Sequence, residues 1–265
     1  MDIGTICKET CEIAKEAGEY IRGESLRFTT GDIETKGKHD YVTYVDKNTE
    51  RKIVNNLQKL IPGAGFIAEE GTYNKQEKKY NWIVDPLDGT TNFIHSLPPY
   101  SVSIALMENE EIILGVIYEI GLDECFFTWK GCPAYLNGEE INVSKISKVT
   151  DSLLATGFPF SNYDRFDKFI ESLKYFMRNS HGVRRMGSAA VDLAYTACGR
   201  FDAFWEYNLN PWDIAAGVII LKNAGGKVSD FSGENNYLFG KEIVAGNPYL
   251  FEEFLEHVRK FMSEQ

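Results

Sequence analysis

Three apolar runs between Ser101 and Lys130 constrain the fold more than any other part of the sequence. The segment reads SVSIALMENEEIILGVIYEIGLDECFFTWK, and two charged stretches, ENEE and GLDE, separate its apolar runs. Apolar runs of strand length that alternate with short polar turns are typical of a meander of antiparallel strands. The Asn137–Gly138 pair that follows predicts another tight turn. The sequence therefore predicts an antiparallel sheet near the middle of the chain.

Helices are predicted before this sheet, and strands alternate with helices after it. Residues 2–22 carry isoleucine and alanine at helical spacing, and a second amphipathic helix is expected to begin at Asp46. The later segments are strands at 152–158, 181–187 and 201–207 and helices at 165–178, 188–199 and 210–226, before a final helix. Mixed helices and strands with an antiparallel meander indicate an α+β or layered α/β fold.

The composition allows a sizeable core and excludes some partners. The 265 residues are 43% apolar, and they fit one large domain or two halves of about 130 residues. The net charge of −11 argues against non-specific binding to nucleic acid or to an anionic membrane. If the substrate is an anion, a metal ion or a local basic group has to offset this negative field.

Cysteine use and hydropathy bear on the compartment. The five cysteines form an odd set without zinc-type spacing, which indicates a reduced, intracellular protein. The first residues, MDIGTICKETCEIAKEAG, contain acids and no continuous apolar core, so they do not read as a signal peptide. No apolar stretch approaches the roughly 18 residues of a membrane span. We therefore expect a cytoplasmic protein that does not cross a membrane.

The segment WIVDPLDGTTN, residues 82–92, ends an apolar run in two aspartates. Asp-Pro and Asp-Gly are common turn dipeptides, so a plain turn is one interpretation. The functional interpretation is a strand end that presents Asp85 and Asp88 as hard oxygen ligands. The proline between them restricts the backbone, and the glycine after them lets it turn sharply. Mg²⁺ binds carboxylate and carbonyl oxygens, so the Leu87 carbonyl would join the two acids.

Other acids also follow apolar runs or stand at expected element ends. Each has a structural explanation: a solvated charge pair for Glu69 and Glu70, and helix capping for Asp46 and Asp213. The chain has only four histidines for acid–base chemistry. A site of carboxylates without histidine points to metal-assisted chemistry on a phosphate. The metal would also supply the positive charge that the acidic surface lacks.

Three segments closely resemble the signatures of the inositol monophosphatase family, which are Mg²⁺-dependent, lithium-sensitive phosphatases. They are Glu69–Glu70, WIVDPLDGTTNFIH at 82–95 and NPWDIAAGVIILKNAGG at 210–226. The resemblance extends over the whole chain, and ATGFPF at 155–160 is similar to the SuhB-type bacterial members. It implies a layered α/β sandwich with alternating α-β-α-β-α layers. An N-terminal α+β half, residues 1–145, would carry the metal loop, and a C-terminal α/β half, residues 146–265, would complete the site.

The resemblance also implies a role for each matched residue. Two or three Mg²⁺ ions would be held by Glu69, Asp85, the Leu87 carbonyl, Asp88 and Asp213. The attacking water would be oriented by Glu69 and Thr90, with Asp46 hydrogen-bonded to Thr90. The substrate would contact Asp88, Gly89, Thr90, Gly187, Ser188, Ala189 and Glu206, and Lys36 matches a family lysine near the site. No role follows for Asp192, which lies within a predicted helix.

The implied activity is hydrolysis of a small polyol phosphate, inositol 1-phosphate above all, by metal-activated water. Related branches of the superfamily act on fructose 1,6-bisphosphate, adenosine 3′,5′-bisphosphate or histidinol phosphate, and these stay open as alternatives. A different class is a SuhB-like regulatory protein that binds the transcription machinery. The acidic charge and the lack of a long basic run weigh against direct RNA binding, so a protein partner is the form that this alternative takes. The resemblance also implies a homodimer.

Overall fold

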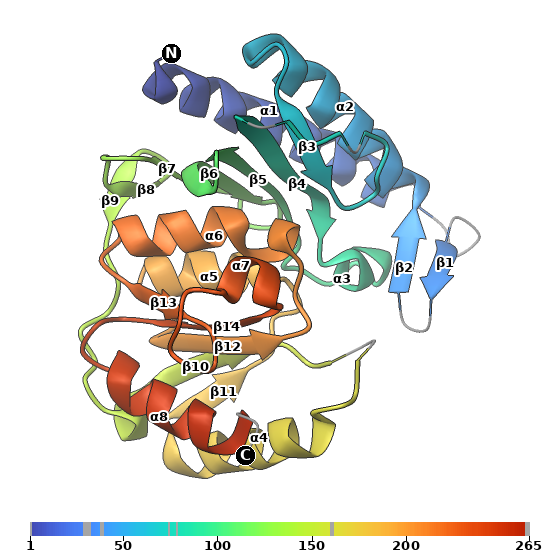
Figure 1. Cartoon of the computed structure of the whole chain (residues 1–265). Helices are drawn as coiled ribbons and strands as arrows, with labels where there is room; N and C mark the ends of the chain where they lie inside the picture. The colour runs from blue at the N-terminus through green and yellow to red at the C-terminus, as the bar shows by residue number, and fades with distance from the viewer. Residues whose placement is uncertain are drawn as a thin grey trace.

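Two large β-sheets alternate with three layers of helices (Figure 1). The computed structural model describes residues 2–28, 33–37, 40–73, 75–77, 79–159 and 162–262, without the side chains of residues 33–37 and 40–42. The layers are, in order, α1 with α2, a seven-stranded sheet, α5 with α6, a five-stranded sheet, and α4 with α8. The predicted sandwich of alternating helix and sheet layers is therefore confirmed.

The first helical layer contains α1 (Ile3–Ser25) and α2 (Tyr44–Leu60). α1 buries the apolar face that its spacing predicts. α2 begins at Tyr44, two positions before the predicted start at Asp46, because Thr43 caps it. The Thr43 hydroxyl accepts a hydrogen bond from the Val45 N–H at 3.0 Å, which satisfies one of the free donors at the helix start. A hairpin of β1 (Ile33–Gly37) and β2 (Asp40–Thr43) precedes α2.

The first sheet has the strand order β3-β4-β5-β6-β7-β8-β9. Its strands are β3 (Gly65–Ala68), β4 (Tyr80–Asp88), β5 (Ser101–Glu108), β6 (Glu111–Glu119), β7 (Glu124–Trp129), β8 (Ala134–Leu136) and β9 (Glu139–Ile141). β3 and β4 pair in parallel, and all other neighbours are antiparallel, so the predicted meander is confirmed. The predicted turn joins β8 to β9, with positive φ at both Asn137 and Gly138.

The middle layer consists of α5 (Ala189–Ala197) and α6 (Pro211–Asn223). One apolar cluster joins both helices to the inner faces of both sheets, which is why these helices are apolar on all sides. α6 packs so closely against β6 that a Cβ at Gly115 would lie 2.7 Å from the Ala216 carbonyl oxygen. This layer carries residues of the second half of the chain to the edge of the first sheet.

The second sheet has the order β11-β10-β12-β14-β13, with β10 parallel to both its neighbours and β14 antiparallel to β12 and β13. Its strands are β10 (Leu153–Thr156), β11 (Gly182–Arg184), β12 (Ala203–Tyr207), β13 (Lys227–Ser229) and β14 (Glu242–Gly246). Its outer face is covered by α4 (Phe166–Asn179) and α8 (Phe251–Met262), which place Phe176 and Phe254 on Trp205. The short elements are α3 (Thr90–Ile94), η2 (Val149–Asp151) and α7 (Tyr237–Gly240).

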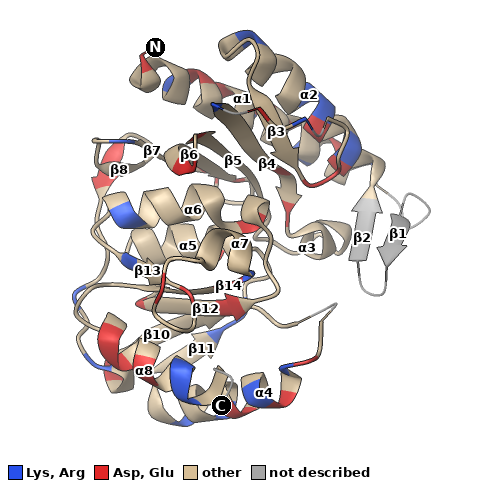
Figure 2. Cartoon of the chain, in the orientation of Figure 1, with Lys and Arg blue, Asp and Glu red and all other residues tan. Residues whose placement is uncertain are grey.

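Charged residues follow the layers. Charged residues of both signs lie on the outer helices α2, α4 and α8, whereas the middle helices are almost free of them (Figure 2). Among the helices that the structure describes, none is both long enough and apolar enough to cross a membrane. The chain leaves the first sheet after Ile141 and enters the second at Leu153. The division into halves at residue 145 stays a prediction.

Candidate active site

The end of the first sheet holds the segment that carries Asp85 and Asp88. β4 continues through both aspartates, and its register against β5 is irregular between them. Such irregularities redirect side chains at the edge of a sheet. Gly89 follows with a φ of 97°, a left-handed conformation that glycine adopts without steric cost, and α3 starts at Thr90. The Leu87 N–H donates to Asp85 Oδ1 at 2.9 Å, which fixes the first carboxyl group.

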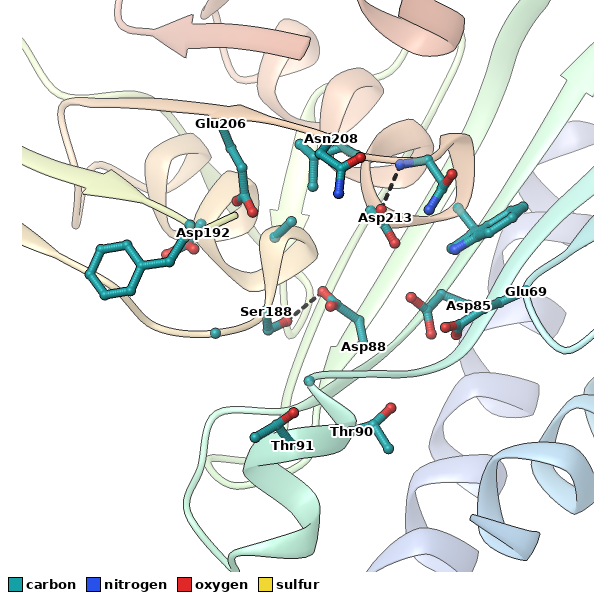
Figure 3. A pocket seen from close by; sticks show the side chains of 18 of the residues that line it. Glu69, Asp85, Asp88, Thr90, Thr91, Ser188, Asp192, Glu206, Asn208 and Asp213 are labelled. Carbon is teal, nitrogen blue, oxygen red and sulfur yellow. Dashed lines mark hydrogen bonds between the residues drawn. The ribbon is translucent and has the colours of Figure 1, made fainter. Parts of the chain in front are cut away.

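Four carboxyl groups from three parts of the chain gather in one cavity of about 380 Å³ (Figure 3). Glu69 follows β3, Asp85 and Asp88 belong to β4, and Asp213 lies in the first turn of α6. The other predicted site residues in the cavity wall are Leu87, Gly89, Thr90, Gly187, Ser188, Ala189 and Glu206. The structure thus brings both halves of the sequence to one place.

Burial raises the pKa of three of these carboxyl groups, and neighbouring acids add to the rise for Asp85 and Asp213. The pKa of Asp85 lies well above its usual value, first because the residue is buried and then because Glu69, Asp88 and Asp213 are close. Removal from water and the charge of Asp88 raise the pKa of Asp213 to about 8. Removal from water also raises the pKa of Asp88 to about 6, although Ser188, Ala190 and Arg185 oppose the shift. The cluster as a whole therefore favours proton uptake or the binding of a cation.

The donor set fits a hard divalent cation. Glu69, Asp85, Asp88 and Asp213 offer carboxylate oxygens, which are the ligands that Mg²⁺ prefers. Within the described part of the chain, no three acidic, histidine or cysteine side chains already surround a single point as a metal shell does. The four side chains line the same cavity, so each can present a carboxylate oxygen to an ion within it.

Thr90 and Asp46 are joined across 44 positions of sequence, as the family resemblance implies. Thr90 Oγ1 lies 3.0 Å from Asp46 Oδ1 and 3.1 Å from the Leu87 carbonyl oxygen, and it donates to these acceptors. Asp46 Oδ2 accepts from the N–H and the hydroxyl of Thr43 at 2.8 and 2.6 Å. Burial raises the pKa of Asp46, and the hydrogen bonds from Thr43 and Thr90 oppose that rise. Asp46 thus stands behind the cavity wall and fixes Thr90.

The start of α5 holds Asp88. Asp88 Oδ2 accepts from the Ser188 hydroxyl at 2.6 Å and from the Ala190 N–H at 2.8 Å. Donors at a helix start favour the charged form of a carboxyl group. Gly187 has a φ of 93°, and a Cβ there would lie 2.6 Å from a guanidinium nitrogen of Arg185. The turn at residues 187–189 therefore depends on glycine.

Two acids, Asp213 and Glu50, accept hydrogen bonds from backbone N–H groups that the sequence did not predict. Asp213 is the third residue of α6, and its Oδ2 accepts from the Asn210 N–H at 2.6 Å. Asn210 is the N-cap, so the capping role considered for Asp213 belongs to a reciprocal pair. The loop that carries Glu69 is held by buried Glu50, which accepts from the N–H groups of Glu70 and Thr72 at 2.7 Å. Glu50 could have been suspected only as a buried acid on the inner face of α2.

The cavity is also lined by residues to which the sequence assigned no role in the site: Thr91, Gly157, Phe158, Arg185, Asp192, Asn208, Leu209, Asn210, Trp212 and Lys241. Asp192 is the one with a sequence signal, because it is an acid inside an otherwise apolar helix. Lys36 lies on β1, where the structure does not describe side chains, so its predicted place near the site lies outside the described residues.

The layered fold and this acid-lined cavity are those of a phosphomonoesterase. More closely, the chain belongs to the inositol monophosphatase family, whose model matches residues 3–263. The family resemblance inferred from the three sequence signatures is thereby confirmed.

Individual relatives cover almost the whole chain. It is 41% identical to inositol-1-monophosphatase of Mesorhizobium japonicum over 253 residues, 95% of each chain. It is 39% identical to Nus factor SuhB of Pseudomonas aeruginosa over 251 residues, 93% of each chain. The crystal structure of extragenic suppressor protein suhB from Bartonella henselae superposes with a TM-score of 0.90 at 37% identity, and covers 97% of this chain and 99% of that one. Relatives of similar identity thus carry both an enzyme name and a regulatory name.

Proposed function

We propose that the protein is a Mg²⁺-dependent phosphatase that hydrolyses a small polyol phosphate, with inositol 1-phosphate as the preferred substrate. The observation that carries this proposal is the single cavity shared by Glu69, Asp85, Asp88 and Asp213. The reaction breaks the phosphorus–oxygen bond of the ester and forms a new bond to the oxygen of water, which yields inositol and inorganic phosphate.

Two or three Mg²⁺ ions would be held by Glu69, Asp85, the Leu87 carbonyl, Asp88 and Asp213. When bound, such ions supply the positive charge that stabilises phosphate oxygens and makes water easier to deprotonate. The Leu87 carbonyl also accepts from Thr90, so the same peptide would link a cation ligand to the residue that orients water.

The chain's own groups position the reactants. Thr90 is held by Asp46 and the Leu87 carbonyl, and with Glu69 it would accept and orient the attacking water. The amides of Gly89 and Thr90, at the turn into α3, would donate to phosphate oxygens as charge develops on them. Glu206 and the turn at 187–189 line the part of the cavity where the alcohol of the ester would lie.

The second candidate is a regulatory role, which the Nus factor name of one relative favours. In that case the partner would be a protein of the transcription machinery, and the acidic surface argues against direct contact with RNA. The two roles are compatible, because one would use the cavity and the other an outer face.

Three further properties belong to the same proposal. Lithium sensitivity and a homodimer follow the family resemblance. A reducing cytoplasmic location agrees with the five cysteines, which are all free thiols in the structure.

The test is turnover with and without Mg²⁺. Protein treated with EDTA should be inactive on inositol 1-phosphate, and added Mg²⁺ should restore turnover. Asp85→Asn should lose at least about a hundredfold in kcat, because it removes a central ligand. Asp167→Asn, an exposed substitution on α4 that removes the same charge, is the matched control and should keep wild-type activity. Full turnover in EDTA, or an active Asp85→Asn variant, would refute the proposal. Asp85→Asn should leave a regulatory interaction intact.

A further inference from the structure

Asp192 is a buried acid without an assigned purpose. It lies in the middle of α5, where every residue of the helix is buried, and only 1% of its surface is exposed. Its backbone is used by the helix, since its N–H donates to Ser188 and its carbonyl accepts from the Thr196 hydroxyl. Within the described part of the chain, its side-chain Oδ1 has no hydrogen-bond partner. A buried carboxylate oxygen without a donor is costly, so it calls for a functional explanation.

The side chain belongs to the cavity wall. Asp192 and Glu206 lie toward one end of the cavity, and Glu69 and Asp85 lie toward the other (Figure 3). Glu206 comes from β12. The pKa of Asp192 is raised first by burial and then by the nearby charges of Glu206 and Asp88. The second acidic pair thus lies at the opposite end of the cavity from Glu69 and Asp85, although the charges of Asp88 and Asp213 still reach it.

The chain leaves room for this pair. A Cβ at Gly157 would lie 1.8 Å from Glu206 Oε1, so only glycine at this position allows the Glu206 carboxyl group its observed place. The guanidinium of Arg185 also lines the cavity and favours the charged forms of Asp88, Asp192 and Glu206. Burial nevertheless raises the pKa of both Asp192 and Glu206 well above the usual value. A carboxyl group offers acceptor oxygens in either protonation state, so the pair can accept hydrogen bonds from an occupant that brings donors.

We propose that Asp192 is a specificity-determining residue that acts with Glu206 to bind neighbouring hydroxyl groups of the substrate's alcohol. This inference rests on the proposed phosphatase function and narrows its substrate class to monophosphates of uncharged polyols. Hydroxyl groups donate to both carboxylates without adding charge. A second phosphate at this end would face two acids and one guanidinium, so bisphosphates should be poor substrates.

The experiment compares wild type with Asp192→Leu and Asp192→Asn on two substrates in Mg²⁺. Inositol 1-phosphate offers hydroxyl groups to the pair, whereas p-nitrophenyl phosphate offers none. In Asp192→Leu, kcat/KM for inositol 1-phosphate should fall at least about tenfold relative to p-nitrophenyl phosphate. Asp192→Asn keeps one acceptor oxygen, so its kcat/KM for inositol 1-phosphate should fall less.

Stability separates this role from a structural one. Leucine replaces a buried unpartnered carboxylate inside an apolar helix, so Asp192→Leu should unfold in urea at the same or a higher concentration than wild type. The control is Asp230→Asn, a buried acid outside the cavity that accepts from the N–H groups of Ser232 and Glu234 at 2.9 and 2.8 Å. It should lose stability and keep the wild-type substrate ratio.

Several results would overturn the inference. For Asp192→Leu, these are an unchanged ratio of kcat/KM between the two substrates, or an equal loss of kcat/KM on both substrates together with lower stability. For wild type, they are a preference for histidinol phosphate, which would indicate a cationic occupant, or a preference for fructose 1,6-bisphosphate. Calorimetric binding of myo-inositol itself to wild type and Asp192→Leu decides the inference even without turnover. If wild type hydrolyses none of these esters in Mg²⁺, the proposed phosphatase function fails, whereas weaker inositol binding by the variant still supports the role of Asp192.

Discussion

The acidic cavity should make the cation-free protein less stable as pH rises. The pKa of Asp213 is raised from 3.8 to about 8 and that of Asp88 to about 6. Above pH 3.8 the unfolded chain has lost these protons, whereas the folded chain keeps each one up to its raised pKa. The folded state therefore binds more protons, and the free energy of unfolding falls with pH by about 1.4 kcal/mol per unit for each such group.

Asp85, Asp192 and Glu206 also have pKa values well above the usual range, so the contribution of Asp213 is isolated by comparing wild type with an Asp213 variant between pH 6 and pH 8. Folded Asp88 loses most of its remaining proton in the lower part of this interval, whereas folded Asp213 keeps its proton until the pH approaches 8. Asp213 alone should then reduce the free energy of unfolding by about 2–3 kcal/mol across these two pH units. Its charge also raises the pKa of Asp85 and of Glu206, so the loss of Asp213 should reduce the slope further in the same direction.

The assay is urea unfolding in EDTA at pH 6, 7 and 8, followed by tryptophan fluorescence, for wild type and Asp213→Asn. The wild-type free energy should fall more steeply than that of the variant. Asparagine keeps one acceptor oxygen for the Asn210 N–H, and weakening of this hydrogen bond would cost at most about 1 kcal/mol at every pH, which shifts the line without changing its slope. Mg²⁺ should stabilise wild type more at pH 8 than at pH 6, since protons compete with cations for the same oxygens. Parallel lines for the two proteins would refute this account of the cavity.

Two further substitutions test how the cavity is built. Gly157→Ala should act like a partial loss of Glu206, because the added Cβ displaces the flexible end of that side chain; we expect weaker binding of inositol 1-phosphate, measured as a higher KM, with the urea midpoint nearly unchanged. Asp46→Asn should lower kcat by about 10- to 100-fold through misplacement of Thr90. Thr43→Ala removes the helix cap and one donor to Asp46 but keeps the contact between Asp46 and Thr90, so it should cost about 1 kcal/mol of stability and lower kcat less than Asp46→Asn. Equal kcat losses in these two variants would show that capping alone matters.

Local sequence patterns predicted most of the elements. The helix expected at 2–22 extends from Ile3 to Ser25, and the turn at Asn137–Gly138 joins β8 to β9, because apolar spacing and turn chemistry act over a few residues. The pairing of distant strands could not be predicted in this way. β10 lies between β11 and β12, and β14 between β12 and β13, and this order depends on tertiary packing rather than on any short segment.

The site divides along the same line. Asp85 and Asp88 could be suspected from one short motif, and the family resemblance supplied Glu69 and Asp213. No local pattern reveals that Asp192, in the apolar helix α5, faces the cavity beside Glu206, because the face that a fully buried helix turns to a site is decided by the layers around it. Glu50 is hidden for a similar reason, since its role lies in N–H groups about 20 residues away.

The way the fold uses each carboxyl group separates candidate ligands from supporting residues. Both carboxyl oxygens of Asp46 accept hydrogen bonds inside the protein, one from Thr90 and the other from Thr43, and Asp46 lies outside the cavity wall. Asp88 and Asp213 each place their hydrogen bonds from described residues on a single oxygen, Oδ2, and both line the cavity. A carboxyl group anchored through one oxygen is fixed in direction and still has a second oxygen for a cation. Backbone and hydroxyl donors provide this anchoring without neutralising the carboxylate, so a cation that displaces the proton of Asp213 meets its negative charge.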